Sequence, residues 1–137
     1  MKKKNQTWYG LYARQKLYKK NNIEGSMIWG CQYDAMLRWL QKSEIDVTAN
    51  IGDNKNKGKD QLGNEVGTTG IVETDKVNNI YDLYGNGFEW TLEACVAVFR
   101  VYRGGRYNNS YSLAGHHQDS PDTISSTYST RATLYIP

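Results

Sequence analysis

The sequence predicts a single α+β domain with helices early, small antiparallel sheets late and many long loops. A chain of 137 residues has the usual length of one domain. Helical spacing marks one apolar stripe, made of Tyr33, Met36, Leu37 and Leu40. Strand-like alternation runs through residues 98–103. Helices that precede strands along the chain favour an α+β domain over a parallel βαβ sheet.

The first predicted element is a helix from Thr7 to Lys20. Its stripe is formed by Trp8, Leu11, Tyr12, Gln15 and Tyr18, and basic residues fill its last turn. Asn21 and Asn22 break the pattern, so residues 1–22 read as a basic helical lead-in. A second helix follows with the stripe named above. Core packing is the favoured interpretation of its aromatic and methionine residues, with Trp29 and Trp39 adding bulk.

Loops and strands make up the remaining chain. Residues 50–70 are rich in Gly, Asn, Lys and Asp and predict a long surface loop. From Ile71 onward short strands are expected, including 98–103 and a terminal strand over 131–136. Between these two strands, residues 104–130 are rich in Ser, Asn, Tyr and His.

Composition and charge exclude several classes of protein. No apolar run reaches the length of a membrane span, so no membrane insertion is expected. The basic start lacks a following apolar region, so the chain is expected to be made in the cytoplasm without a signal peptide. Seven basic and no acidic residues occupy the first twenty positions, leaving 10 basic against 14 acidic residues in the rest. Because the excess is confined to one end, no nucleic-acid partner is expected.

The candidate catalytic residues are few. Cys31 and Cys95 are too few for a disulfide scaffold or a four-cysteine zinc site, and we expect both to be buried and inert. The histidine cluster consists of His116, His117, Asp119 and Asp122. Adjacent histidines on an extended chain point to opposite sides, so a polar surface is favoured over a metal site there.

One stretch is more specific. Residues 79–91 read NIYDLYGNGFEWT, and residues 100–105 read RVYRGG. The first resembles the signature YD-x-x-GN-x-x-EWT of the formylglycine-generating-enzyme (sulfatase-modifying-factor) family, and the second resembles that family's R-V-x-R-G-G segment. Residues 26–36, which read SMIWGCQYDAM, resemble the helix entry in phage- and prophage-encoded members, so the resemblance covers roughly residues 26–137. It implies a C-type-lectin-like fold, in which Gly85 and Gly87 allow tight turns and Trp90 anchors the core.

The resemblance also implies a structural Ca²⁺ site. Carried onto this chain, the family's ligands are Asp82, Gly85, Gly87 and Glu89, which offer carboxylate and carbonyl oxygens. The alternative is a metal-free turn in which Glu89 caps backbone amides. Both readings remain open from the sequence.

The family's chemistry is not expected here. Its members oxidise a substrate cysteine with a copper-binding cysteine pair that follows the R-G-G segment. Residues 103–114 contain no cysteine, and the equivalent positions lie near Asn109 and Ala114. Amide and methyl groups cannot replace thiolates as copper ligands, so we expect no copper and no enzyme activity.

The C-terminal segment has an unusual composition. All four Trp and all three Met lie before Gly104, as do all Lys and Glu residues. None of these four residue types has a codon that ends in a pyrimidine. Asparagine codons do end in a pyrimidine, and changing their first two bases gives codons for Tyr, Ser, His, Asp and Arg, among others. Only Gln118 departs from this pattern. The segment is therefore similar to the variable region of proteins diversified by retroelements, some of which have this fold.

This resemblance implies a candidate variable ligand-binding segment at residues 104–130. Its side chains combine rigid aromatic area with adaptable hydrogen bonding, as antibody paratopes do. The candidate positions are Arg106, Tyr107, Asn108, Ser110, Tyr111, Ser112, His116, His117, Asp119, Asp122 and Tyr128.

The expected function is a non-catalytic ligand-binding module, such as a phage receptor-binding protein or a retroelement-diversified variable protein. It would be displayed on a virion or cell surface and would bind a protein or carbohydrate ligand on a cell surface. The alternatives are a structural domain of a phage tail assembly and a formylglycine-generating-type enzyme. An ordinary polar loop also stays open for the segment, as does a homo-oligomer for the chain.

Overall fold

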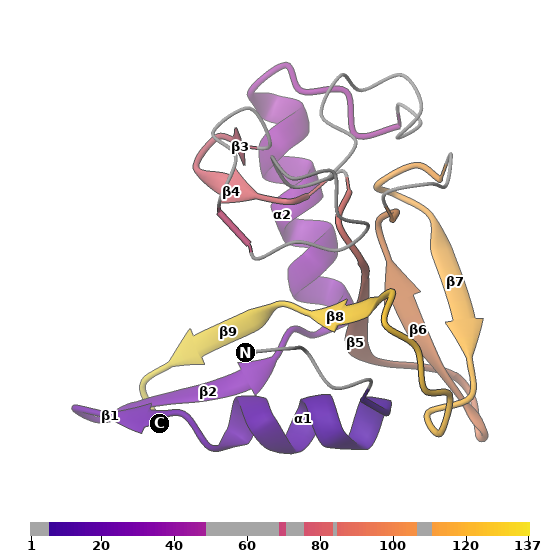
Figure 1. The fold of residues 1–137 in the computed structure, drawn as a ribbon. Helices are drawn as coiled ribbons and strands as arrows, with labels where there is room; N and C mark the ends of the chain where they lie inside the picture. The colour runs from indigo at the N-terminus through magenta and orange to yellow at the C-terminus, as the bar shows by residue number, and fades with distance from the viewer. Residues whose placement is uncertain (1–5, 49–68, 71–75, 84, 107–110) are drawn as a thin grey trace.

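The computed structural model describes residues 6–48, 69–70, 76–83, 85–106 and 111–137. Its elements confirm an α+β domain with the helices early in the chain (Figure 1). The two helices are α1 (Trp8–Lys16) and α2 (Gly30–Lys42). The strands are β1 (Lys19–Lys20), β2 (Ile23–Met27), β3 (Lys76–Val77), β4 (Ile80–Tyr81), β5 (Phe88–Val96), β6 (Phe99–Arg103), β7 (His116–Asp119), β8 (Tyr128–Thr130) and β9 (Ala132–Tyr135).

These strands form three small sheets. Their orders are β1-β2-β9, β3-β4 and β7-β6-β5-β8. The prediction of antiparallel sheets is wrong for one pair of strands, because β8 pairs with β5 in parallel. This arrangement brings a segment near the C-terminus beside the middle of the chain, and β8 leads directly into β9 of another sheet (Figure 1).

The first helix is shorter than predicted. The Thr7 hydroxyl caps it by accepting a hydrogen bond from the Gly10 amide, and the helix ends at Lys16 rather than Lys20. Asn21 and Asn22 both have positive φ, which suits a tight hairpin turn between β1 and β2. Lys19 therefore pairs with Glu24 across the hairpin, at 2.8 Å, instead of continuing the helix.

The second helix buries the predicted stripe only in part. Tyr33, Leu37 and Leu40 are buried, and Met36 packs against them. The prediction is wrong for Trp29 and Trp39, whose exposed fractions are 53% and 49%. Trp29 precedes the first turn, and Trp39 is turned about 200° from Leu37 because each helical residue adds about 100°.

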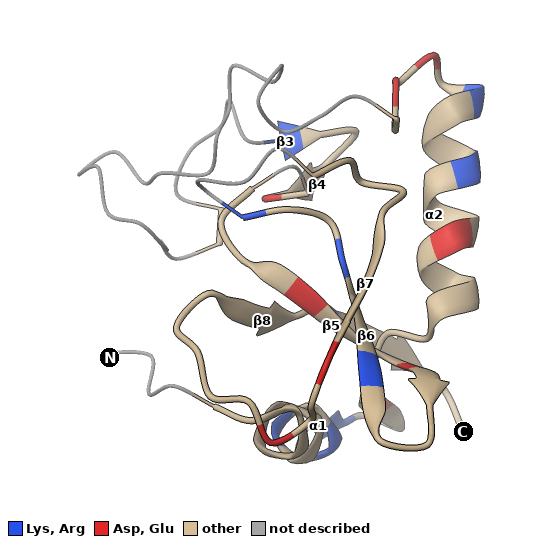
Figure 2. Ribbon diagram, turned by 90° about the vertical axis from the view of Figure 1, so that its right-hand side faces the viewer, with Lys and Arg blue, Asp and Glu red and all other residues tan. Residues whose placement is uncertain are grey.

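The four-stranded sheet separates two cores. On one side, α2 packs with Leu83, Val47 and Leu113. On the other side, Trp8 of α1 packs with Met27 and Trp90, which confirms Trp90 as a buried anchor. Figure 2 shows α2 along one side of the sheet and α1 at its end.

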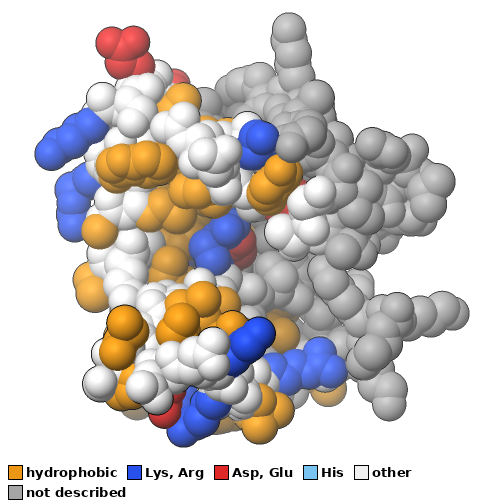
Figure 3. Space-filling model, turned by 90° about the vertical axis from the view of Figure 1, so that its left-hand side faces the viewer, with side chains coloured by type: hydrophobic (Ala, Val, Ile, Leu, Met, Phe, Trp, Pro, Cys, Tyr) orange, Lys and Arg blue, Asp and Glu red, His pale blue; other side chains and the backbone are white. Residues whose placement is uncertain are grey.

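Both cysteines are exposed, so the prediction that they are buried is wrong. Cys31 lies in the first turn of α2, and Cys95 lies where β5 has left the core. The apolar run around Cys95 ends in a solvent-facing hairpin, in which Val96 and Val98 are also exposed. Figure 3 shows hydrophobic side chains on one face in separate groups, divided by polar atoms and by Lys and Arg side chains.

The strands at 98–103 and 131–136 are confirmed as β6 and β9. Residues 104–130 contain β7 and β8, which we did not predict. The loop predicted over 50–70 lies outside the described residues, except for residues 69 and 70.

Candidate functional site

One side of the four-stranded sheet collects aromatic residues from four separate segments. Strand pairing sets Tyr102 opposite His117, and Phe88 beside Tyr128. Paired residues project from the same side of a sheet, so these rings converge. Tyr111, which precedes β7, completes the group. We call Phe88, Tyr102, Tyr111, His117 and Tyr128 the aromatic face.

The rings of the aromatic face contact one another. Centroids lie 4.1 Å apart for Tyr111 and His117, and 5.5 Å apart for Tyr102 and His117. Phe88 lies beneath them, with its centroid 4.7 Å from that of Tyr102. Only 4% of Phe88 is exposed, whereas 39% of Tyr111 is exposed. The outer rings therefore rest on a fixed base and remain accessible to solvent.

Charged groups border the aromatic face. The Tyr128 hydroxyl donates to Asp119 Oδ2 at 2.8 Å, while Asp119 Oδ1 accepts from the Ser120 amide at 2.7 Å. The Arg106 guanidinium lies 5.4 Å from the centre of the Phe88 ring. The carboxylate of Asp119 and the guanidinium of Arg106 thus flank the tyrosine and histidine rings.

Burial sets the protonation of the face. It is the main cause that raises the pKa of Tyr128 and of Tyr102, so both hydroxyls stay protonated and can donate. Burial also lowers the pKa of His117, and the nearby His116 and Arg103 act in the same direction. His117 is consequently neutral at pH 7 and presents an uncharged ring.

The structure brings together five of the predicted ligand-binding residues. Those that belong to the aromatic face or border it are Arg106, Tyr111, His117, Asp119 and Tyr128.

The other predicted positions are placed differently. His116 projects from the opposite side of β7 and lies 3.5 Å from Glu93, as expected for adjacent residues of a strand. Ser112 and Asp122 lie in the turns before and after β7. Tyr107, Asn108 and Ser110 lie outside the described residues.

Sequence reasoning missed Phe88 and Tyr102. Tyr102 belongs to the alternating pattern of residues 98–103, which placed it on the side opposite Val101. Nothing in the pattern showed that this side would meet β7 and β8, because that depends on pairing between distant segments.

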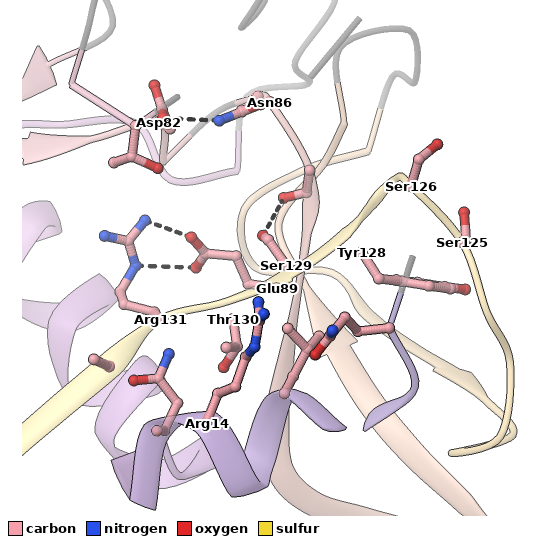
Figure 4. A pocket seen from close by; sticks show the side chains of 17 residues that line it. Arg14, Asp82, Asn86, Glu89, Ser125, Ser126, Tyr128, Ser129, Thr130 and Arg131 are labelled. Atoms are coloured by element: carbon pink, nitrogen blue, oxygen red, sulfur yellow. Dashed lines mark hydrogen bonds and ion pairs between the residues drawn. The ribbon is translucent and has the colours of Figure 1, made fainter. Parts of the chain in front are cut away.

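The residues predicted to bind calcium lie together around a different feature. Glu89 is buried, and both of its carboxylate oxygens accept hydrogen bonds from Arg131, at 3.0 Å from Nε and 2.5 Å from Nη2 (Figure 4). Arg131 Nη2 also donates to the Tyr81 carbonyl. Burial raises the pKa of Glu89, and Arg131 opposes this shift. A guanidinium therefore holds the carboxylate that a metal ion would need.

The neighbouring turn has its own hydrogen bonds. Asp82 Oδ2 accepts from the Asn86 side chain at 2.9 Å, and the backbones of both residues have positive φ. A Cβ on Gly87 would lie 2.9 Å from the Thr127 carbonyl oxygen, which accounts for a glycine there. Within the described part of the chain, no three His, Cys, Asp or Glu side chains gather as metal ligands. Because Arg131 occupies both carboxylate oxygens of Glu89, this arrangement does not suit the binding of a calcium ion. The calcium site stays a prediction.

No family model, curated protein or solved structure matches this chain. Among the described helices, none has the length and apolar character needed to cross a membrane.

Proposed function

We propose that this domain is a non-catalytic ligand-binding module that binds through its aromatic face. The observation that carries the proposal is the convergence of Tyr111, His117 and Tyr128 over the buried ring of Phe88. The composition of residues 104–130 predicts each of these three as a binding position.

The chemistry of the face supports binding. Tyr and His rings offer large contact areas at a small cost in conformational entropy, and Asp119 and Arg106 add charge at the border. Partly exposed aromatic residues that surround a buried centre are also typical of protein-binding surfaces. The ligand would be a protein or a carbohydrate on a cell surface.

The resemblances in sequence give the proposal its finer form. They support a C-type-lectin-like domain of a phage or prophage receptor-binding protein, or of a retroelement-diversified variable protein, displayed on a virion or cell. The scaffold strands β5 and β6 would stay constant while residues 104–130 vary. The missing cysteine pair in residues 103–114 supports a non-catalytic role.

A genomic observation tests the diversification. The coding sequence should lie near a reverse transcriptase gene and a near-repeat of its own C-terminal part that differs at adenines. Differences confined to codons of the candidate positions would support the proposal. A repeat that differs equally in the codons of β5 and β6 would contradict it.

A binding experiment tests the face itself. Fluorescently labelled protein is applied to a glycan array and to bacterial cells, and the variants Tyr111→Ala and His117→Ala are compared with the unmodified chain. We expect each variant to lose about tenfold in affinity, as for a central interface residue. Trp39→Ala is the matched control, because it removes a similarly exposed ring from α2.

Unchanged binding by the aromatic-face variants would contradict the proposal. If the aromatic-face variants bind as well as the control but change the sedimentation of the protein, the face is an assembly interface. The protein would then be a structural tail domain or a homo-oligomer, and the binding proposal would fail.

A further inference from the structure

A pocket of about 480 Å³ is lined in part by β8, the strand that also carries Tyr128 of the aromatic face. Its walls come from α1, from the turn between β4 and β5, and from the chain that runs through β8 into β9 (Figure 4). Pockets of this size accept small organic molecules. Tyr128 lines it, but Tyr111, His117 and Arg106 do not, so it can be tested apart from the aromatic face.

One wall of the pocket carries a cation. The side chain of Arg14 rises from α1 into the cavity, as Figure 4 shows. Among the described residues, no hydrogen bond, ion pair or ring contact engages this guanidinium. Lys16, on the same helix, instead lies at the ring and hydroxyl of Tyr135 and does not line the pocket. Arg14 is therefore available to an acidic ligand.

The opposite wall carries an acceptor. Asp82 uses Oδ2 to accept from Asn86, and within the described part of the molecule its Oδ1 has no donor. Between the two walls lies the ion pair of Glu89 and Arg131, whose charges cancel. Among the lining residues that the structure describes, the four charged side chains thus sum to zero, which suits a ligand with one negative charge better than a dianionic phosphate.

Hydroxyl groups make up much of the remaining lining. They belong to Thr69, Ser125, Ser126, Tyr128, Ser129 and Thr130. The Ser126 hydroxyl has no partner among the residues that the structure describes, whereas Ser129 and Thr130 donate to carbonyls of β5 or the preceding turn. Hydroxyl groups both donate and accept, so this surface complements a ligand that is itself rich in hydroxyl groups.

We propose that this pocket binds a small polyhydroxylated carboxylic acid, that is, a sugar acid. Its carboxylate would pair with Arg14, and its hydroxyl groups would donate to Asp82 and exchange hydrogen bonds with Ser126. A carboxylate and a guanidinium can form two parallel hydrogen bonds, which makes Arg14 the main determinant of charge preference. The site does not depend on the proposed function of the aromatic face.

The test uses D-glucuronate as the probe, with D-glucose and glucose 6-phosphate as comparisons. Binding is measured on the full chain by ¹H–¹⁵N NMR titration, which follows the amides of Ser126 and Thr130. We expect saturable shifts with glucuronate and affinity about tenfold weaker for glucose, which lacks the carboxylate that pairs with Arg14. Glucose 6-phosphate should also bind more weakly than glucuronate, because the described lining does not balance its second negative charge.

Two variants of α1 decide the role of Arg14. Arg14→Gln should weaken glucuronate binding about tenfold. Lys16→Gln removes the same charge from the same helix and should leave binding unchanged. Tyr111→Ala should also leave it unchanged, so failure of the aromatic-face proposal would not affect this result.

Three outcomes would overturn the inference. The first is that glucuronate causes no saturable shifts. The second is that glucose binds as tightly as glucuronate, or that glucose 6-phosphate binds more tightly. The third is that Arg14→Gln and Lys16→Gln weaken glucuronate binding equally. Because Arg14 is exposed, Arg14→Gln is expected to fold, and its dispersed NMR spectrum verifies this.

Discussion

Replacing Arg131 by Met would leave a buried carboxylate without its partner. In the folded protein Glu89 is 9% exposed and Arg131 is 20% exposed, and two hydrogen bonds join them. Removing one member of such a buried pair costs about 3–5 kcal/mol. The Tyr81 carbonyl loses a donor as well. We expect the free energy of unfolding at pH 7 to fall by an amount in that range.

The size of the loss should depend on pH. Burial already raises the pKa of Glu89, and Arg131 is the main group that opposes this shift. Without Arg131 the folded-state pKa rises further above the ordinary value of 4.5. The folded variant then takes up a proton as the pH falls through its raised pKa, so its deficit should shrink toward pH 4.5.

Urea denaturation, followed by tryptophan fluorescence at pH 7 and near pH 4.5, measures both effects. The double variant Glu89→Gln with Arg131→Met is the control, because it removes the buried charge together with its partner. It should recover most of the stability, and it keeps the test decisive if the single variant does not fold. A single variant within 1 kcal/mol of the unmodified protein at pH 7 would refute this reasoning.

Because Arg131 holds both oxygens of Glu89, calcium chloride or EDTA should leave the Tm unchanged; a rise in Tm with calcium would favour the metal site instead. The pKa of His117, read by NMR titration, should lie below 6.5, since burial disfavours its charged form. Its contribution to stability should accordingly be complete above pH 6.5 and be lost as the pH falls toward the folded-state pKa, which a midpoint above 6.5 would contradict. Finally, Cys31 and Cys95 should both react rapidly with a thiol reagent in the native protein, and a thiol that reacts only in urea would show that it is buried.

Local patterns predicted much of the secondary structure. The spacing of Tyr33, Leu37 and Leu40 predicted α2 and its buried side, and alternation predicted β6. The same approach extended α1 too far, because Lys19 and Lys20 suit a helix end as well as a hairpin. The pairing of β1 with β2 and the positive φ of Asn21 and Asn22 distinguish the hairpin from a continued helix.

Hydrophobicity alone predicted burial less well. Cys95 lies in an apolar run, yet β5 leaves the core before reaching it. Trp39 is large and apolar, yet its position on α2 turns it away from the core. Burial is set by which surfaces meet, and a single residue's chemistry does not contain that information.

From the sequence we could predict the α+β class, the main helix α2 and five residues that lie at the candidate binding surface. The tertiary structure alone decided that Phe88 and Tyr102 join them, since this requires β5, β6, β7 and β8 to pair in one register. It also decided that Arg131 pairs with Glu89, although 41 residues lie between them. Contacts between distant segments depend on the packing of the whole chain, whereas helical and strand periodicities depend on neighbouring residues.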